Sequence, residues 1–319
     1  WSSDVCSSDL NKYAFVTILF GSDPEYAAQA LFLGYQLHKW EQHKEIDKCV
    51  IIDRTVENHI REALATFFIL IDYDQIEVRT SWKKAQSREN WWGVWQKLHT
   101  MNLTLYEKVV VLDTDLFIQK PIHDLFDYQT PAGSMWNKQL VIPDNSHISS
   151  THYHSDQTKN AFMINAGVMV FTPCARTYEK WLELVTKVRN NATWGKMPEQ
   201  EFLSLIENWH MIVDNFNIAG FRRQTASKYQ KECPHELLNL AKEARIIHIT
   251  GKNRTPRQTK IDKRAKGSYW FDSDMYTPDA QQFIAGIYGT IRRWCDTLYL
   301  DREVWDEVKR IIKIGRAHV

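Results

Sequence analysis

Several common nucleotide-binding signatures are missing from this chain. It has no Walker phosphate loop and no Gly-x-Gly-x-x-Gly after its first apolar run, which argues against nucleoside triphosphatases and dinucleotide-dependent enzymes. No apolar stretch approaches the length needed to cross a bilayer, and no internal repeat is apparent. The formal net charge is only +1, with 44% hydrophobic residues. Composition therefore favours a folded protein that is not a general binder of polyanions such as nucleic acid.

The cysteines also form no pattern that would define a disulfide framework. Apart from Cys6, the cysteines are far apart and in no metal-ligand spacing: Cys49, Cys174, Cys233 and Cys295. They are predicted to be buried or free thiols. The lack of a disulfide framework favours a cytoplasmic location. Three glycosylation triplets, at Asn102, Asn191 and Asn253, leave open the Golgi lumen, reached through an anchor missing from this fragment.

The two ends of the chain are expected to be artefacts. Residues 314–319 can be encoded by a DNA string whose reverse complement encodes residues 4–9. Two antisense termini are typical of a sequencing adapter translated at both ends. Residues 1–10 and 314–319 are therefore excluded from the fold prediction, and the natural protein is expected to be longer at one or both ends.

Strands and helices alternate along the first part of the chain. Apolar runs predict strands at 13–20, 48–53 and 75–78, and apolar spacing predicts helices at 25–40 and from 57 to about 68. A helix over 87–106 carries Trp91, Trp92 and Trp95, which we interpret as a packing face in preference to a sugar platform. The alternation predicts an α/β fold with a doubly wound, largely parallel sheet, whose first half commonly binds a nucleotide.

The stretch from Lys108 to Ile118 organises these elements. Three valines and a leucine form a run typical of a strand buried on both faces, and Asp113 and Asp115 follow it directly. Ligands of open α/β sheets bind beyond the carboxyl ends of the strands. Two carboxylates in that place suit a divalent ion that holds a phosphorylated ligand. The alternative is that Asp113 merely begins a turn or caps a helix.

Later segments carry further polar residues at strand ends. An apolar strand pair over 161–171 is interrupted by Asn165, Ala166 and Gly167, which indicates either an ordinary bulge or a close approach of the backbone to a ligand. A late strand over 244–252 contains His248. Between them lie a strand at 132–136, a polar loop at 137–160 with surface histidines, a helix at 175–189, and a helix that opens at Pro198.

Together these segments resemble the glycogenin-like nucleotide-sugar glycosyltransferases of family 8, including the plant enzymes that transfer glucuronic acid. The resemblance covers about residues 13–252. Its landmarks, in the order of the family, are Ala14–Ile18, Trp92–Leu98, Val111–Asp115, Pro121–Phe126, Asn165–Val168, Glu199-Gln200 and His248–Gly251. One Asp-x-Asp is a weak signal, whereas seven ordered landmarks are a specific one.

The resemblance implies a Rossmann-like nucleotide-diphospho-sugar transferase fold of the GT-A type, with a mostly parallel central sheet and flanking helices. The expected catalytic domain covers 11–255, and a C-terminal helical extension covers 256–313. The resemblance also implies a UDP-sugar donor, with UDP-glucose or UDP-glucuronic acid favoured, and transfer with retention of anomeric configuration. Mn²⁺ is the expected cofactor, with Mg²⁺ as an alternative. The acceptor is left open among a glycan, a protein tyrosine and a lipid, and so is a homodimer.

Site residues follow from the same resemblance. The metal ligands would be Asp113, Asp115 and His248, and the catalytic residues Glu199, Gln200 and Lys97. The residues expected to bind the donor are Thr17, Ile18, Tyr26, Lys97, Asp113, Thr114, Asp115, Asn165, Ala166, Gly167, Gly251, Lys252 and Arg254.

Two departures from the family pattern bear on activity. The family usually has Asp-Gln where this chain has Glu199-Gln200, and Glu is one methylene longer. The family also has Lys-Pro-Trp in the closing loop, where Arg254 could replace the lysine because a guanidinium also binds phosphate. These departures leave open a non-catalytic carbohydrate- or nucleotide-sugar-binding protein on the same fold. A phosphohydrolase that uses the Asp-x-Asp pair is more remote, because Leu116 and Phe117 follow where such enzymes have Gly and Thr or Val.

Overall fold

The structure is a computed structural model that describes residues 12–21, 24–43, 45–76, 91–135, 146–149, 163–188, 198–219 and 242–248. Several predictions lie outside these residues: the adapter-derived ends, the C-terminal extension over 256–313, and the closing-loop residues Gly251, Lys252 and Arg254. Within the described residues, no helix is both long enough and apolar enough to cross a membrane.

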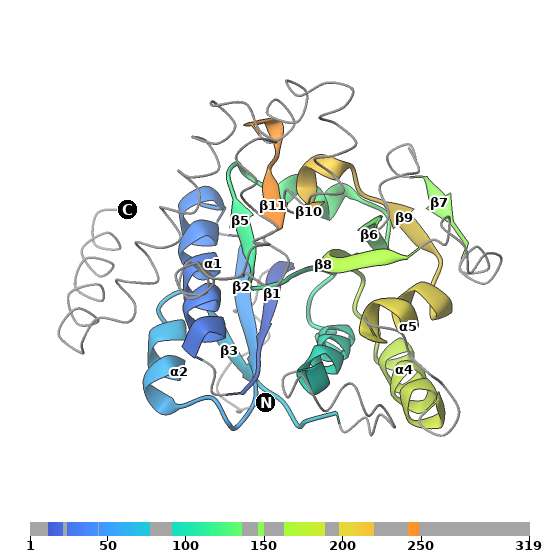
Figure 1. The fold of residues 1–319 in the computed structure, drawn as a ribbon, viewed down its shortest axis with the longest axis horizontal. Helices are drawn as coiled ribbons and strands as arrows, with labels where there is room; N and C mark the ends of the chain where they lie inside the picture. Colours follow the sequence, from blue (N-terminus) through green and yellow to red (C-terminus); the bar gives the residue numbers. More distant parts are fainter. Residues whose placement is uncertain are drawn as a thin grey trace, which may run out of the picture.

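A twisted sheet forms the centre of the described fold (Figure 1). Its strand order is β3-β2-β1-β4-β8-β6-β9-β7. The strands are β1 (Tyr13–Leu19), β2 (Ile46–Ile52), β3 (Ile69–Asp72), β4 (Lys108–Leu112), β6 (Ala132–Met135), β7 (His147–Ile148), β8 (Ile164–Phe171) and β9 (Trp209–Met211). The β3-β2-β1-β4 half is parallel, and β8 lies antiparallel to both β4 and β6. The predicted α/β fold with a mostly parallel sheet is confirmed.

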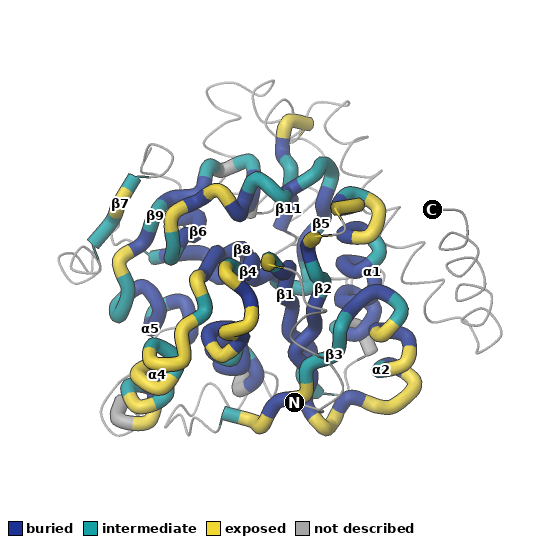
Figure 2. The backbone as a smooth tube through the Cα atoms, turned by 180° about the vertical axis from the view of Figure 1, so that it is seen from behind, coloured by how far each residue is buried: buried dark blue, intermediate teal, exposed yellow. Residues whose placement is uncertain are grey.

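Helices cover both faces of the sheet. The helices α1 (Pro24–Trp40) and α2 (Asn58–Leu64) lie on one face. The 3₁₀ helix η3 (Trp91–Asn102) and the helices α4 (Ala175–Val188) and α5 (Pro198–Ile206) lie on the other. In β4, Val110 and Leu112 join the core beneath α1, whereas Val109 and Val111 join the core beneath η3. From Val109 to Leu112 the strand is apolar because both of its faces are buried, as the dark blue tube at β4 in Figure 2 shows.

The third strand begins six residues earlier than its predicted position at 75–78. The helix α2 ends at Leu64, and the β-branched stretch from Ile69 pairs in parallel with β2. At the predicted position, the Ile76 N–H donates to Oε1 of Gln96, and Nε2 of Gln96 donates back to the Ile76 carbonyl. The side-chain amide of Gln96 on η3 thus makes the backbone hydrogen bonds of Ile76 that a neighbouring strand would otherwise make. The sequence pattern could not show this long-range contact.

A second, smaller sheet lies at the edge where β4 ends (Figure 1). It has the order β10-β11-β5, with β5 (Leu116–Ile118), β10 (Ile218–Ala219) and β11 (Ile246–His248). The strand β11 is antiparallel to β5, and His248 pairs with Leu116. This register brings the late histidine beside the Asp113–Asp115 turn, although more than 130 residues separate them along the chain.

Aromatic and cysteine predictions are confirmed where the structure describes them. Trp95 is 1% exposed and packs edge-to-face on Phe202 of α5. It is therefore a core residue and not a sugar platform, whereas the side chains of Trp91 and Trp92 lie outside the described part. Cys49 is a buried free thiol and Cys174 an exposed one.

His99 makes the stability of this fold depend on pH. Its Nε2 lies 2.9 Å from the carbonyl oxygen of Asp74, and its Nδ1 lies 2.8 Å from the hydroxyl of Tyr178. Nε2–H donates to Asp74 and Nδ1 accepts from Tyr178, which suits a neutral ring. Burial lowers the pKa of His99 from its ordinary 6.5 to about 4.

We expect the free energy of unfolding to fall by about 2 kcal/mol from pH 7 to pH 5 because of His99. In this range the unfolded chain takes up a proton at His99 and the folded chain does not. The stabilising contribution is thus present above the ordinary pKa and is lost as the pH falls toward the lowered one. Urea unfolding of the wild type and of His99→Gln at both pH values measures it. An equal pH dependence in the two proteins would contradict the assignment to His99.

Candidate active site

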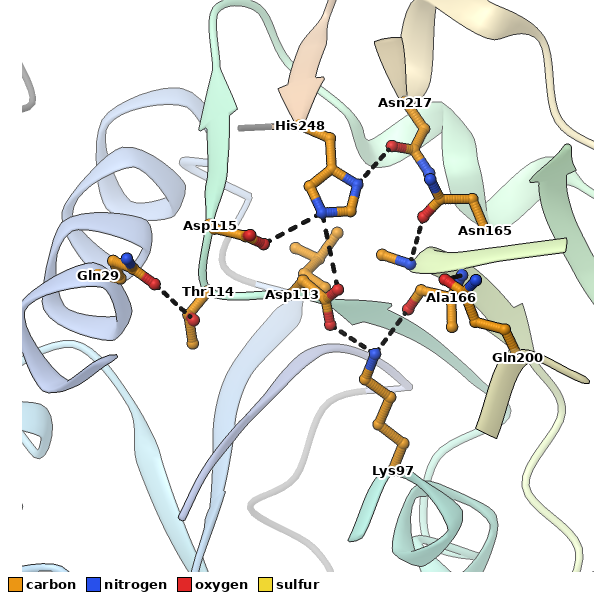
Figure 3. A network of polar contacts seen from close by, with 12 residues as sticks. Gln29, Lys97, Asp113, Thr114, Asp115, Asn165, Ala166, Gln200, Asn217 and His248 are labelled. Atoms are coloured by element: carbon orange, nitrogen blue, oxygen red, sulfur yellow. Dashed lines mark hydrogen bonds and ion pairs between the residues drawn. The ribbon is translucent and has the colours of Figure 1, made fainter. Parts of the chain in front are cut away.

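The turn Asp113-Thr114-Asp115 sends its side chains in three directions from the end of β4 (Figure 3). Asp113 continues the alternation of Val109 and Val111 and meets Lys97 of η3, with Oδ1 2.7 Å from Nζ. Thr114 faces α1, where its hydroxyl lies 3.3 Å from Oε1 of Gln29. Asp115 faces β11, with Oδ1 3.1 Å from Nε2 of His248. Asp113 does begin a turn, and that turn places both carboxylates at the site.

Asn217 fixes the orientation of the His248 ring. The Nδ2 group of Asn217 donates to the Ser134 hydroxyl at 2.7 Å, so its Oδ1 faces Nδ1 of His248 at 3.1 Å. Nδ1 therefore carries the proton, and Nε2 presents a lone pair. That lone pair lies 3.1 Å from Asp115 Oδ1 and 3.7 Å from Asp113 Oδ2. Three electron-rich atoms that converge in this way repel one another, and a cation bound between them would relieve this repulsion.

A bulge in β8 forms the wall of the site beside His248. Gly133 of β6 pairs with Met169, but Ser134 pairs with Asn165, so residues 166–168 of β8 are extra between them. The predicted bulge is confirmed, but it lies within one continuous strand, so the strand pair predicted over 161–171 is wrong. Oδ1 of Asn165 accepts the N–H of Gly167 at 2.9 Å, and the Gly167 carbonyl accepts the N–H of Asp113. A Cβ on Gly167 would overlap the His248 ring, so glycine is required for this close approach.

Lys97 connects the turn, the bulge and α5. Its buried ammonium lies 2.7 Å from Asp113, 3.6 Å from Oε1 of Glu199, and donates to the carbonyl of Ala166 at 3.1 Å. Burial opposes the charged form of Lys97, but the carboxylates of Asp113 and Glu199 outweigh this effect and raise its pKa. Lys97 is therefore a fixed positive charge at the centre of the site.

The first turn of α5 supplies the two predicted catalytic side chains. Glu199 and Gln200 are both buried, and Oε1 of Gln200 accepts the N–H of Ala166 at 2.9 Å. Burial raises the pKa of Glu199, although Lys97 acts in the opposite direction. The structure thus brings Glu199, Gln200 and Lys97 together with the Asp-x-Asp turn.

The residues expected near the nucleotide base lie at or near the same edge of the sheet. Thr17 and Ile18 are in β1, and the Thr17 hydroxyl donates to the carbonyl of Leu112 at 2.8 Å. Both side chains are largely buried, so they support the end of β4 as well as offering a surface to a nucleotide. Tyr26 packs against the core beneath α1, 6.3 Å from the ring of Phe20.

The residues present fit a divalent metal ion. Asp113, Asp115 and His248 each offer one ligand atom, and these atoms lie within 4.8 Å of one another. Two carboxylate oxygens and a neutral imidazole suit Mn²⁺ and related ions. Among the described residues, three carboxylates and a single ammonium group face one another here, so an additional cation would reduce the repulsion between the carboxylates.

Sequence reasoning did not identify Asn217 and Ser134, which orient His248, or Gln29, which contacts Thr114 of the turn. Each is a polar residue with an almost completely buried side chain. Asn217 lies in a run of mixed composition just before β10, and nothing in its neighbourhood distinguishes it. Only the pairing of β10 with β11 places it beside His248.

Comparisons with known proteins identify the family of this chain. The sequence profile described as "Glycosyl transferase family 8" matches residues 17–254. An uncharacterized protein, R707 of Acanthamoeba polyphaga mimivirus, is 30% identical over 69% of this chain and 76% of its own length. Glycogenin of Komagataella phaffii is 22% identical over 75% of this chain and 56% of its own length. Inositol phosphorylceramide glucuronosyltransferase 1 of Arabidopsis thaliana is 25% identical over 62% of this chain, but only 30% of its own length.

The solved structures show the same fold. The galactosyltransferase LgtC, in complex with donor and acceptor sugar analogues, superposes with a TM-score of 0.56 at 13% identity. The match covers 92% of this chain and 99% of LgtC. At this identity the likeness establishes the GT-A type of fold alone. The family profile, which covers most of the chain, establishes more: this protein belongs to glycosyl transferase family 8.

Proposed function

We propose that this protein is a retaining glycosyltransferase that moves a hexosyl or hexuronosyl group from a UDP-sugar to an acceptor hydroxyl. UDP-glucose and UDP-glucuronic acid are the favoured donors, and Mn²⁺ is the favoured metal. The observation that carries the proposal is the convergence of Asp113, Asp115 and the lone pair of His248 Nε2, next to the buried cation Lys97. The names of the relatives, a glycogenin and a glucuronosyltransferase, support these two donors.

An unsatisfied donor group also supports a ligand at this site. The Nδ2 group of Asn165 is buried and has no hydrogen-bond acceptor within the described part of the chain. A buried amide without an acceptor is costly, so such groups are usually satisfied by water or by a ligand. A hydroxyl or phosphate oxygen of the donor would satisfy it. Asn165 belongs to the bulge that contacts both the metal-ligand turn and α5.

The chemistry can be assigned to these residues as follows. A divalent ion held by Asp113, Asp115 and His248 would neutralise the diphosphate of the leaving group. Lys97 would add a fixed positive charge beside that diphosphate, and the family resemblance assigns Lys252 and Arg254, which lie outside the described residues, to the same phosphate site. Glu199, held near Lys97, acts at the anomeric carbon as nucleophile or as electrostatic stabiliser. Gln200 holds the β8 bulge in place through the Ala166 N–H, which positions the sugar.

A UDP-release assay tests the proposal directly. The purified protein is incubated with UDP-glucose, UDP-glucuronic acid, UDP-galactose or UDP-xylose, each with Mn²⁺ or with EDTA. We expect release from UDP-glucose or UDP-glucuronic acid, and only with the metal present. Failure to bind UDP in the presence of Mn²⁺ would refute the proposal. Tight binding of UDP without release, even with a range of glycan acceptors, would instead favour the non-catalytic binding protein.

A further inference from the structure

A second cluster of potential metal ligands lies where α1 ends. It consists of Glu41, His43 and His123, whose ligand atoms lie within 4.8 Å of one another. Glu41 and His43 directly follow α1, and His123 is the first residue of the 3₁₀ helix η4 (His123–Asp127). None of the three contacts the Asp113–Asp115 turn in the interactions that the structure gives them.

Glu41 is an unusual residue for a purely structural role. Its side chain is completely buried. One carboxylate oxygen accepts the backbone N–H of Ile122, and the other, Oε2, lies 3.2 Å from Nδ1 of His123. A buried carboxylate requires a compensating charge as well as hydrogen bonds. Lys48 attracts this carboxylate electrostatically, but no ion pair or hydrogen bond joins the two described side chains.

The hydrogen bond of Nε2 in His123 determines whether Nδ1 is a donor or an acceptor. Nε2 lies 3.2 Å from Oδ1 of Asp124, and the other oxygen of Asp124 is held by Arg245 at 2.7 Å. When Nε2–H of a neutral ring donates to Asp124, Nδ1 presents a lone pair to the carboxylate of Glu41. This arrangement is repulsive unless a cation lies between the two atoms. A carboxylate that accepts the second N–H of a histidine is also the usual environment of a metal-bound histidine.

The distances match a four-coordinate transition metal. Ligands about 2.0–2.1 Å from a tetrahedral Zn²⁺ lie roughly 3.3 Å apart, close to the 3.2 Å between Glu41 and His123. His43 supplies a third ligand, since its ring lies edge-on to that of His123 with the centroids 4.4 Å apart. His43 is exposed, so water can fill a fourth position.

We propose that Glu41, His43 and His123 form a second metal site, for Zn²⁺ or a similar transition-metal ion, that is separate from the candidate active site. Asp124 and Arg245 orient His123 within it. The ion links the end of α1 to η4 and to the segment that leads into β11. It therefore stabilises the small β10-β11-β5 sheet at the end opposite to His248, where Arg245 pairs with Asp124 of η4. This site does not depend on the proposed transferase activity.

Zn²⁺ binding to the intact chain tests the proposal. Equilibrium dialysis and thermal unfolding are measured for the wild type, His43→Ala and His123→Gln. We expect each variant to bind one Zn²⁺ fewer than the wild type, and the Zn²⁺-dependent rise of the unfolding midpoint to be lost. His59→Ala is the matched control, because His59 is an exposed histidine beside a carboxylate, 3.3 Å from Glu57. It should behave as the wild type does.

Two further measurements test whether the bound Zn²⁺ belongs to this cluster and not to the candidate active site. Asp113→Asn weakens the candidate active site, and the ion that depends on His43 should still bind to this variant. His43 is exposed, so its replacement leaves the fold intact, and circular dichroism verifies this. Equal Zn²⁺ stoichiometry in the wild type and His43→Ala would overturn the proposal. In that case a proton on His123, shared between Glu41 and Asp124, would be the compensating charge.

Discussion

Asp113→Asn is expected to reduce donor-dependent UDP release by at least about 10²-fold, through loss of a metal ligand. The substitution keeps the shape of the side chain but removes the charge that faces both Lys97, at 2.7 Å, and His248, at 3.7 Å. Two readouts should change together: steady-state UDP release, and Mn²⁺ affinity measured by electron paramagnetic resonance. Full activity of Asp113→Asn, or unchanged Mn²⁺ affinity, would contradict the assigned role.

A matched acid distinguishes this effect from a general loss of charge. Asp74 pairs with Arg54 at 3.2 Å, and its side chain is 92% exposed. Asp74→Asn is expected to retain both activity and metal affinity, because exposed ion pairs contribute little. Thermal unfolding of both variants is also required. In Asp113→Asn, Glu199 is the one carboxylate of the described residues that remains within ion-pair distance of the buried Lys97 ammonium.

Gly167→Ala is expected to reduce Mn²⁺ affinity and UDP release by about 10²-fold or more, although no ligand atom is removed. The new methyl group would overlap the His248 ring, and Asn217 and Asp115 hold this ring on its two nitrogens. The ring must therefore rotate and break both contacts. A misplacement of about 1 Å at a reacting site can cost roughly 10²-fold in rate.

Gly133→Ala is the control for this prediction. Gly133 lies opposite the same bulge on β6, but its Cβ would meet the Trp209 ring only at 3.2 Å, away from His248. We expect a modest loss of stability and nearly normal Mn²⁺ affinity. Equal effects of the two glycine substitutions on metal binding would show that the contact between Gly167 and His248 is not the cause.

The residue types and their order along the chain were enough to predict the fold class. The apolar run before Asp113 indicated a strand buried on both faces, and the two cores on either side of β4 explain why. The third strand was misplaced because local apolarity cannot show that Gln96 completes the hydrogen bonds of Ile76. A long-range side-chain contact decided that boundary.

The candidate site divides in the same way. Asp113 and Asp115 could be identified from the sequence alone, because a strand end is a local feature and two carboxylates are a recognisable ligand pair. Their partnership with His248 was inferred from a resemblance, and the register of β11 on β5 accounts for it physically. The proton position on His248, the need for glycine at 167 and the cluster around Glu41 are determined by the tertiary structure alone. Each depends on contacts between residues about 30 or more positions apart, which no local pattern of side chains encodes.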